Sequence, residues 1–311
     1  MLGADAVGIA PIERFEGTPV QMDPRQIMPE AKSVIAMAFR INRGSLRGIE
    51  EGTFFSNYSS MGYGGLTYLY MPMVVINLAK HIEDYGFEAI PYGHQSGWRA
   101  IDNEGRLRNG YSRPVAEGRA RPDVMVHLRI AAYLAGLGEI GYSKVFLTPQ
   151  FGPRQRIGIV ITEAELEPDP VYNGTPLCDG CKICVAECPG NAISGEETVE
   201  VKLAGNTIKW GKLDCKACAS AFTGGEEAGP GEEASYVQGR NLKPGAITPF
   251  YKKPHALYNT GQAVCGGQGC LRACMVHLES RGVLQNRFEK PFRRRKPWKV
   301  DWSNPEKEST V

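Results

Sequence analysis

The spacing of the cysteines is the strongest chemical signal in this chain. The run Cys178-x-x-Cys181-x-x-Cys184-x-x-x-Cys188-Pro189 places four thiolates at the intervals that ligate iron–sulfur clusters. In two-cluster proteins the fourth cysteine of such a run ligates the other cluster, so the spacing predicts more cysteines downstream. These are Cys215, Cys218, Cys265, Cys270 and Cys274. The pattern therefore predicts two [4Fe–4S] clusters.

Nine cysteines leave one over after two four-thiolate clusters. We assign one cluster to Cys178, Cys181, Cys184 and Cys274, and the other to Cys188, Cys218, Cys265 and Cys270. Cys215 is the candidate spare, and the roles of Cys215, Cys218 and Cys265 relative to one another stay open. A pair of structural zinc sites is a second interpretation, because CxxC pairs are typical zinc ligands. A disulfide framework is a third, although such frameworks are usual in short secreted chains.

Composition limits the classes of partner. Lys and Arg number 36 against 34 Asp and Glu, so no overall field favours nucleic acid or a membrane surface. A basic patch near the carboxyl end is either a solvated tail or an RNA contact; it consists of Arg293, Arg294, Arg295, Lys296 and Lys299, interleaved with Phe292, Trp298 and Trp302. No apolar run reaches the roughly 20 residues of a membrane helix. Without a leader pattern, a cytoplasmic location is expected, and whether the native start lies upstream of Met1 stays open.

Two periodicities divide the chain into segments. Short apolar runs alternate with helical stretches before residue 170, which is typical of a mixed α/β domain. Strands are expected at 6–10, 33–39, 87–91 and 156–162, and helices at 66–85 and 122–135. In the first helix the expected apolar face is Leu69, Met73, Ile76, Leu78 and Ile82. The predicted domains are 1–170, a cysteine-bearing 171–280 and a basic tail 281–311.

A glycine-rich segment matches the sequence of a nucleotide-binding motif but not its expected structural context. Gly136-Leu137-Gly138-Glu139-Ile140-Gly141 fits GxGxxG, with Glu163 at about the distance of a ribose-binding acid. That fingerprint must follow a strand and open a helix, whereas the preceding segment here has helical periodicity. We interpret the glycines instead as allowing close approach of a flat, bulky group, since they have no side chain.

Further motifs resemble those of the corrinoid-dependent iron–sulfur reductases, which include the reductive dehalogenases and epoxyqueuosine reductase. The resemblance extends from GADAVGIAP at the start to Cys274. Its matching residues include Gly136, Leu137, Gly138, Gly141, Thr148, Pro149, Phe151, Gly152 and Pro153, followed by Leu213, Asp214 and Cys218. The motifs are specific to the superfamily and much less specific to a reaction. The second cysteine group departs from the family's usual CxxCxxxCP run.

This resemblance implies a nitroreductase-like, cobalamin-binding α/β domain followed by a two-cluster ferredoxin-like domain. The corrinoid is expected to be held base-off, in agreement with the absence of DxHxxG around any histidine. The resemblance implies that the following residues contact the corrinoid: Gly136, Leu137, Gly138, Gly141, Thr148, Pro149, Phe151, Gly152 and Arg154. A low-potential electron donor such as ferredoxin or flavodoxin is expected to feed the clusters. Nucleic acid is not an expected partner, and whether the chain forms a homodimer is left open.

Removal of halide by a Co(I) corrinoid requires a proton donor and a nearby cation. The resemblance implies a tyrosine with a lysine or arginine beside it, and the candidates by position are Tyr92 or Tyr142 with Lys144, Arg154 or Arg156. The leading interpretation is a cobalamin- and [4Fe–4S]-dependent reductase, most simply a dehalogenase of a small organohalide. The alternatives are an epoxyqueuosine reductase-like enzyme acting on tRNA, an electron carrier without substrate chemistry, and a flavin reductase.

Overall fold

The computed structural model describes residues 3–94, 113–122, 124–223, 235–238, 247–250 and 263–292. Outside these ranges lie residues 293–311 of the predicted tail, residues 224–234 and most of residues 92–111. The strands are β1 (Ala6–Pro11), β2 (Ser33–Arg40), β3 (Ala89–Tyr92), β4 (Glu139–Ile140), β5 (Phe146–Leu147), β6 (Gln155–Thr162), β7 (Ile193–Leu203), β8 (Asn206–Leu213), β9 (Ser235–Gln238) and β10 (Ile247–Phe250). The helices are α1 (Arg47–Glu51), α2 (Met71–Glu83), α3 (Leu128–Leu134), α4 (Ile183–Ala186), α5 (Cys215–Thr223), α6 (Val264–Gln268) and α7 (Cys270–Arg281), with the π-helix η5 (Tyr58–Tyr70) and short 3-10 turns η1 (Ile12–Phe15), η2 (Val20–Met22), η3 (Pro24–Gln26) and η4 (Arg43–Leu46).

A four-stranded sheet of order β1-β2-β6-β3 forms the frame of the front half. Every neighbouring pair in it is antiparallel, and β2 pairs with β6 from Ser33 opposite Thr162 to Arg40 opposite Gln155. All four strands expected from the sequence are present, with ends shifted by at most two residues. Their apolar runs are buried because both faces of this sheet are covered.

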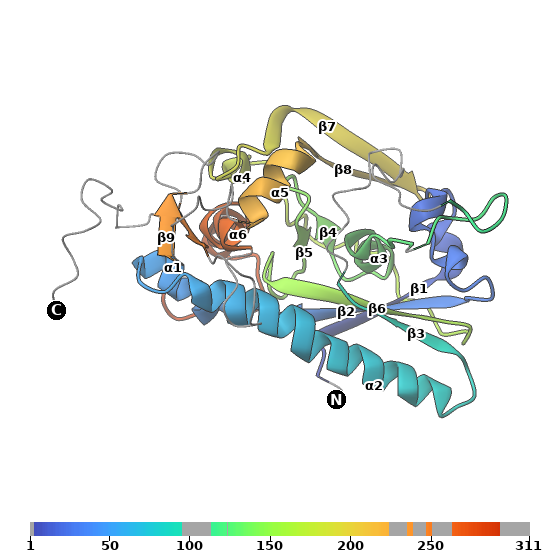
Figure 1. Cartoon of the computed structure of the whole chain (residues 1–311). Coiled ribbons are helices and arrows are strands. Elements are labelled where there is room, and N and C mark those ends of the chain that lie inside the picture. Colours follow the sequence, from blue (N-terminus) through green and yellow to red (C-terminus); the bar gives the residue numbers. More distant parts are fainter. Residues whose placement is uncertain are drawn as a thin grey trace.

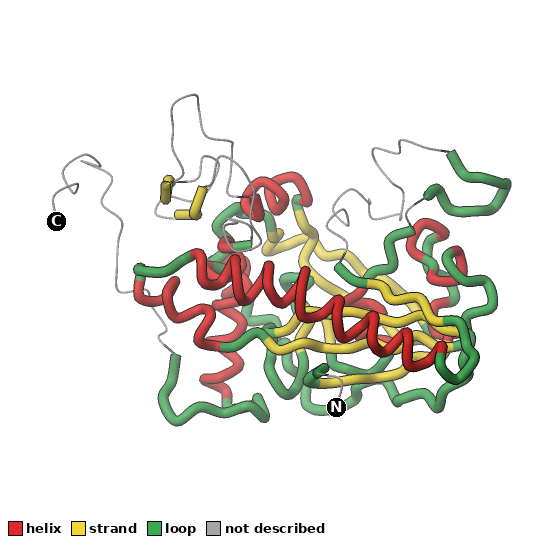
Figure 2. The backbone as a smooth tube through the Cα atoms, turned by 60° about the horizontal axis from the view of Figure 1, so that its bottom comes forward, coloured by secondary structure: helices red, strands yellow, loops and turns green. Residues whose placement is uncertain are grey.

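Helices α2 and α3 cover opposite faces of the sheet (Figure 1). Figure 2 shows the long helix α2 extending over one face of the sheet. This helix packs through Met71, Val74, Val75 and Ala79. The predicted apolar face was therefore partly wrong: Leu78 and Ile82 pack against the sheet, whereas the other three predicted residues are exposed, namely Leu69, Met73 and Ile76. Helix α3 begins at Leu128, six residues later than the expected start at 122.

A long hairpin of β7 and β8 lies over α3, on the side away from the sheet (Figure 1). Its turn residues Ala204 and Gly205 both have positive φ, the backbone of a two-residue hairpin turn. Leu203, Ile208 and Trp210 from this hairpin are buried in the same core as the inner side chains of the sheet. Residues on both sides of position 170 therefore share one core, and the predicted domain limits remain a prediction.

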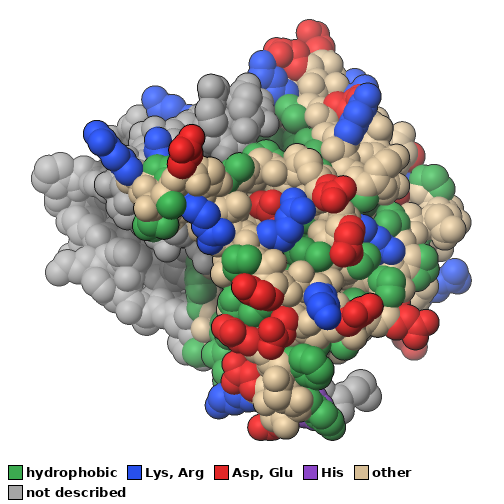
Figure 3. Space-filling model, turned by 90° about the vertical axis from the view of Figure 1, so that its right-hand side faces the viewer, with side chains coloured by type: hydrophobic (Ala, Val, Ile, Leu, Met, Phe, Trp, Pro, Cys, Tyr) green, Lys and Arg blue, Asp and Glu red, His purple; other side chains and the backbone are tan. Residues whose placement is uncertain are grey.

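The cysteine-bearing helices α4, α5, α6 and α7 gather at one end of the molecule (Figure 1). A buried ion pair joins them to the front half: Arg272 of α7 donates two hydrogen bonds to Glu50 of α1, with side chains 3% and 0% exposed. The opposite face carries acidic and basic side chains interspersed (Figure 3), which agrees with the nearly balanced net charge. The fold thus holds the cysteine helices against one end of the sheet.

Candidate active site

Four thiols line a narrow cavity beside α4 and α7. They are Cys178, Cys181, Cys184 and Cys274, and the cavity measures about 20 Å³. Burial, and then the neighbouring thiols of Cys178 and Cys181, raise the pKa of Cys184 to about 11. A metal that binds these sulfurs must displace their protons, so the donors converge on a site whose chemistry suits a cation or cluster.

The surroundings of this thiol group hold its sulfurs in place. The backbone N–H of Tyr142 donates to Cys178 Sγ at 3.3 Å, and Asp179 Oδ1 accepts from the Cys181 N–H at 3.2 Å. Asp179 Oδ2 lies 2.8 Å from His277 Nε2. Asp179, Cys181 and His277 bring one potential ligand atom each within 4.8 Å of one another, so the zinc interpretation keeps a structural basis.

A second set of four thiols lines a larger cavity of about 200 Å³. This set consists of Cys188, Cys218, Cys265 and Cys270. Burial, followed by the thiols of Cys188 and Cys218, raises the pKa of Cys270 to about 12. Cys215 lines neither cavity and begins α5, whose amino end is capped by Asp214 through bonds to the Lys216 and Ala217 N–H groups. Cys218 lies one turn further along the same helix.

The walls of this larger cavity join the sheet to the cysteine helices. Strand β6 supplies Gln155, Arg156 and Ile157, while η5 supplies Tyr58, Tyr63 and Thr67; the remaining wall includes Met71, His94, Leu128, Arg129, Phe146, Ala221 and Phe222. Among the described lining residues there is no carboxylate. If a bound metal takes the four thiols as thiolates, a proton inside the described cavity is left to come from a phenol, an imidazole or water.

Two tyrosines and one arginine lie together in the polar part of the cavity. Arg156 donates to the Tyr58 hydroxyl at 3.2 Å, and its guanidinium lies 4.7 Å from the ring centroid of Tyr63. Burial raises the pKa of Tyr58 above its usual value, and the charge of Arg156 opposes that rise. The Tyr63 hydroxyl lies 2.9 Å from that of Tyr68 and 3.2 Å from His94 Nε2. The sequence analysis named Arg156 as a candidate cation but missed the tyrosines and His94 around it.

The three predicted catalytic residues lie outside the lining of this cavity. The Tyr92 hydroxyl donates to Val124 O and accepts from the Val126 N–H, so it joins two backbone segments. The Tyr142 hydroxyl donates to Ser194 O, beside the first thiol group. The Lys144 Nζ lies 4.7 Å from the Trp210 ring centroid, and burial lowers the pKa of this lysine to about 8.

The glycine-rich segment approaches the chain's own backbone. A Cβ on Gly136 would lie 2.1 Å from Pro170 O, and one on Gly138 would lie 1.9 Å from Leu147 O. Both have positive φ, so the two glycines are required locally without any bound group. Neither lines the larger cavity, nor does Leu137; Gly141 lines the narrow cavity of the first thiol group.

The other predicted corrinoid contacts also pack within the protein. Thr148 and Gly152 exchange backbone hydrogen bonds across a turn that contains Pro149 and Phe151. Arg154 is fully buried and donates to Ile41 O at 2.9 Å and to Asn286 Oδ1 at 2.8 Å. None of these residues lines the larger cavity, whereas their neighbours Pro153 and Arg156 do.

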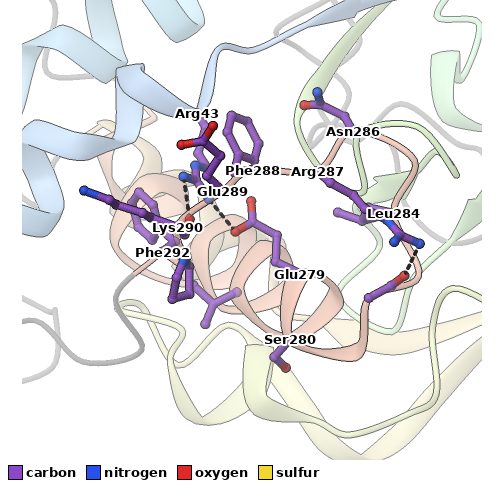
Figure 4. A pocket seen from close by; sticks show the side chains of 13 residues that line it. Arg43, Glu279, Ser280, Leu284, Asn286, Arg287, Phe288, Glu289, Lys290 and Phe292 are labelled. Atoms are coloured by element: carbon purple, nitrogen blue, oxygen red, sulfur yellow. Dashed lines mark hydrogen bonds and ion pairs between the residues drawn. The ribbon is translucent and has the colours of Figure 1, made fainter.

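A further hollow of about 290 Å³ lies at the carboxyl end of α7 (Figure 4). There Arg43 donates to Glu279 at 2.8 Å and to Lys290 O at 3.0 Å, and its guanidinium stacks 3.6 Å from the Phe288 ring centroid. No thiol lines this hollow. Its ion pair joins η4 to α7, and the two groups of four thiols line the other two cavities.

Sequence comparison relates the chain to two kinds of reductase. It is 31% identical over 166 residues to a tetrachloroethene reductive dehalogenase of Dehalobacter restrictus, which covers 50% of this chain and 25% of the relative. It is 24% identical over 208 residues to an epoxyqueuosine reductase of Bacillus cereus, which covers 65% and 42% respectively. By sequence, the chain is similar to parts of reductive dehalogenases and of epoxyqueuosine reductases. No family model matches it.

The matches leave much of each reductase uncovered. A match to the tetrachloroethene reductive dehalogenase of Sulfurospirillum multivorans, 44% identical over 69 residues, covers 21% of this chain and 14% of that protein. Among solved structures, a catabolic reductive dehalogenase in complex with 3-bromo-4-hydroxybenzoic acid gives a TM-score of 0.49 at 21% identity, covering 71% of this chain and 27% of the other. The chain thus spans less than half the length of the curated reductases named here. Among the helices of the described ranges, none combines the length and apolar character that a bilayer crossing needs.

Proposed function

We propose that the chain forms the catalytic part of a corrinoid- and iron–sulfur-dependent reductase that removes halide from a small organic molecule. The observation that carries the proposal is the cavity between the sheet and the second thiol group, where four cysteines face two phenols and a guanidinium. The relationship to reductive dehalogenases supports the reaction class. The net reaction takes R–X, two electrons and one proton to R–H and halide.

The donor sets suit the cofactors to different degrees. Two groups of four thiols match the ligand requirement of two [4Fe–4S] clusters. The aromatic and apolar walls of the larger cavity suit the faces of a macrocycle. Its volume of about 200 Å³ is below the roughly 300 to 1,000 Å³ usual for ligand sites, so corrinoid binding requires this space to widen substantially.

The chain's own residues would position the substrate and supply the proton. When bound, the clusters and corrinoid supply the electrons that break the carbon–halogen bond. Tyr63 is the proposed proton donor, because its hydroxyl bonds two polar groups and its ring lies under Arg156. The guanidinium of Arg156 would stabilise the negative charge that develops as halide leaves. Tyr58 holds that guanidinium through a hydrogen bond.

Anaerobic reconstitution with iron, sulfide and hydroxocobalamin tests the proposal, followed by halide release from tetrachloroethene and from 3-bromo-4-hydroxybenzoic acid. We expect halide release that requires retained cobalt and a low-potential reductant. Reduction of an epoxyqueuosine-containing RNA stem-loop without halide release would favour the epoxyqueuosine reductase alternative, which the sequence relationship also supports. Reducible clusters without either reaction would indicate an electron carrier.

Matched variants make the test specific to the site. Cys218→Ser is expected to lose about half of the iron, whereas Cys215→Ser, on the same helix, keeps it. Tyr63→Phe is expected to lower turnover by about a hundredfold or more, the usual contribution of a positioned general acid. Tyr92→Phe should leave turnover unchanged, because the Tyr92 hydroxyl joins the Val124 and Val126 backbone and Tyr92 does not line the cavity. Equal turnover in Tyr63→Phe and the parent protein would reject this phenol as the donor.

A further inference from the structure

Tyr63 lies at the inner end of a row of polar groups that reaches the protein surface. The Tyr63 side chain is 1% exposed and lines the cavity, whereas Tyr68 is 40% exposed and is not part of the described lining. Their hydroxyls are 2.9 Å apart, and His94 Nε2 lies 3.2 Å from the Tyr63 hydroxyl. The three rings contact one another edge to face, with centroids 5.6 to 6.0 Å apart.

The π-helical form of η5 makes this contact possible. Tyr63 and Tyr68 are five residues apart, and in an α-helix of 3.6 residues per turn they would point about 140° away from each other. A π-helix bonds i to i+5 and so places such a pair on the same side. π-Helical turns are uncommon and frequently occur at functional sites. The unusual backbone therefore coincides with the pair of hydroxyls that it aligns.

We propose that Tyr68 is a proton-relay residue that returns a proton from solvent to Tyr63 after each turnover, with His94 holding the Tyr63 hydroxyl in place. This inference rests on the proposed function. The Tyr63 O–H bond breaks as its proton goes to the substrate carbon, while two electrons arrive from the external reductant and halide leaves. The Tyr68 O–H then breaks to restore Tyr63, and water restores Tyr68. One proton from water is consumed for each halide released.

The hydrogen-bonded pair can be tested without catalysis. In the cluster-loaded protein, 3-fluorotyrosine at position 68 gives a ¹⁹F resonance whose shift and titration midpoint report the state of that hydroxyl. Tyr63→Phe is expected to change both. The control is 3-fluorotyrosine at position 85, because Tyr85 is 72% exposed and contacts the His81 ring instead. An unchanged ¹⁹F response at position 68 would overturn the proposal.

Kinetics then test the relay itself. Tyr68→Phe keeps the ring contacts but removes the outer hydroxyl, so the first halide should be released at the parent rate. Later turnovers should slow by about tenfold or more, since a general acid must be recharged through a poorer route. Tyr85→Phe should match the parent protein throughout. Steady-state turnover of Tyr68→Phe within twofold of the parent value would overturn the relay. If no halide is released at all while the ¹⁹F resonance at position 68 still responds to Tyr63→Phe, the result would instead reject the proposed function.

Discussion

Replacing Arg272 by Met should strongly destabilise the junction between the two halves of the protein. The guanidinium and the Glu50 carboxylate are 3% and 0% exposed and share two hydrogen bonds. Removing one partner of such a pair leaves a charge in a buried site, which costs about 3 to 5 kcal/mol. The free energy of unfolding, measured anaerobically by urea titration with far-UV circular dichroism, should fall by that amount.

Two comparisons decide whether burial causes this loss. The double variant Glu50→Leu with Arg272→Met removes both charges and should recover most of the stability. Arg47→Met breaks an ion pair with side chains 48% and 34% exposed, and should cost no more than about 0.5 kcal/mol. Arg272 lies between Cys270 and Cys274 on α7, so its single variant should also lose iron during purification. A loss below about 1 kcal/mol in Arg272→Met, or no recovery in the double variant, would refute this reasoning.

Three further substitutions test the local arguments. Gly138→Ala should lower the free energy of unfolding, measured by thermal unfolding, by more than about 2 kcal/mol, because its Cβ would overlap the Leu147 carbonyl. Gly86 also has a positive φ but faces open space, so Gly86→Ala should cost only about 1 kcal/mol. Lys144→Met should stabilise the protein by about 2 kcal/mol below pH 8, because burial lowers the pKa of that lysine to about 8 in the folded state. The stability of the parent protein increases between this pKa and the higher pKa of the unfolded chain, so the gain should vanish as the pH rises through that interval. A gain that does not depend on pH would contradict this. Tyr92→Phe should cost about 1 to 3 kcal/mol in urea unfolding by leaving a buried N–H without its partner, and a neutral result would contradict that hydrogen bond.

Strands and cysteine groups were the parts most accessible from the sequence. The buried runs that became β2 and β6 contain almost only apolar residues, so their length and composition indicated strands directly. The β7–β8 hairpin was missed although Val199, Val201 and Leu203 alternate with polar residues and Gly205 marks its turn. Gly195, Glu196 and Glu197 interrupt that period of two at the start of β7, which weakens the signal.

The cavity residues could not be predicted because their roles depend on tertiary contacts. Tyr58 and Tyr63 lie in a segment without any charge, where nothing in the local pattern distinguishes a cavity residue from a core residue. Arg156 was named only by its distance from the first cluster cysteine, and strand alternation alone does not say that it faces η5. Conversely, Gly136 and Gly138 matched a binding motif although the structure shows close backbone packing around both.

The most direct measurement of the central claim is the metal and cofactor content of anaerobically reconstituted protein, determined together with its absorption spectrum. The account predicts about eight iron atoms with matching sulfide, and about one retained cobalt, per chain. Zinc in place of iron, or iron without retained corrinoid, would contradict it.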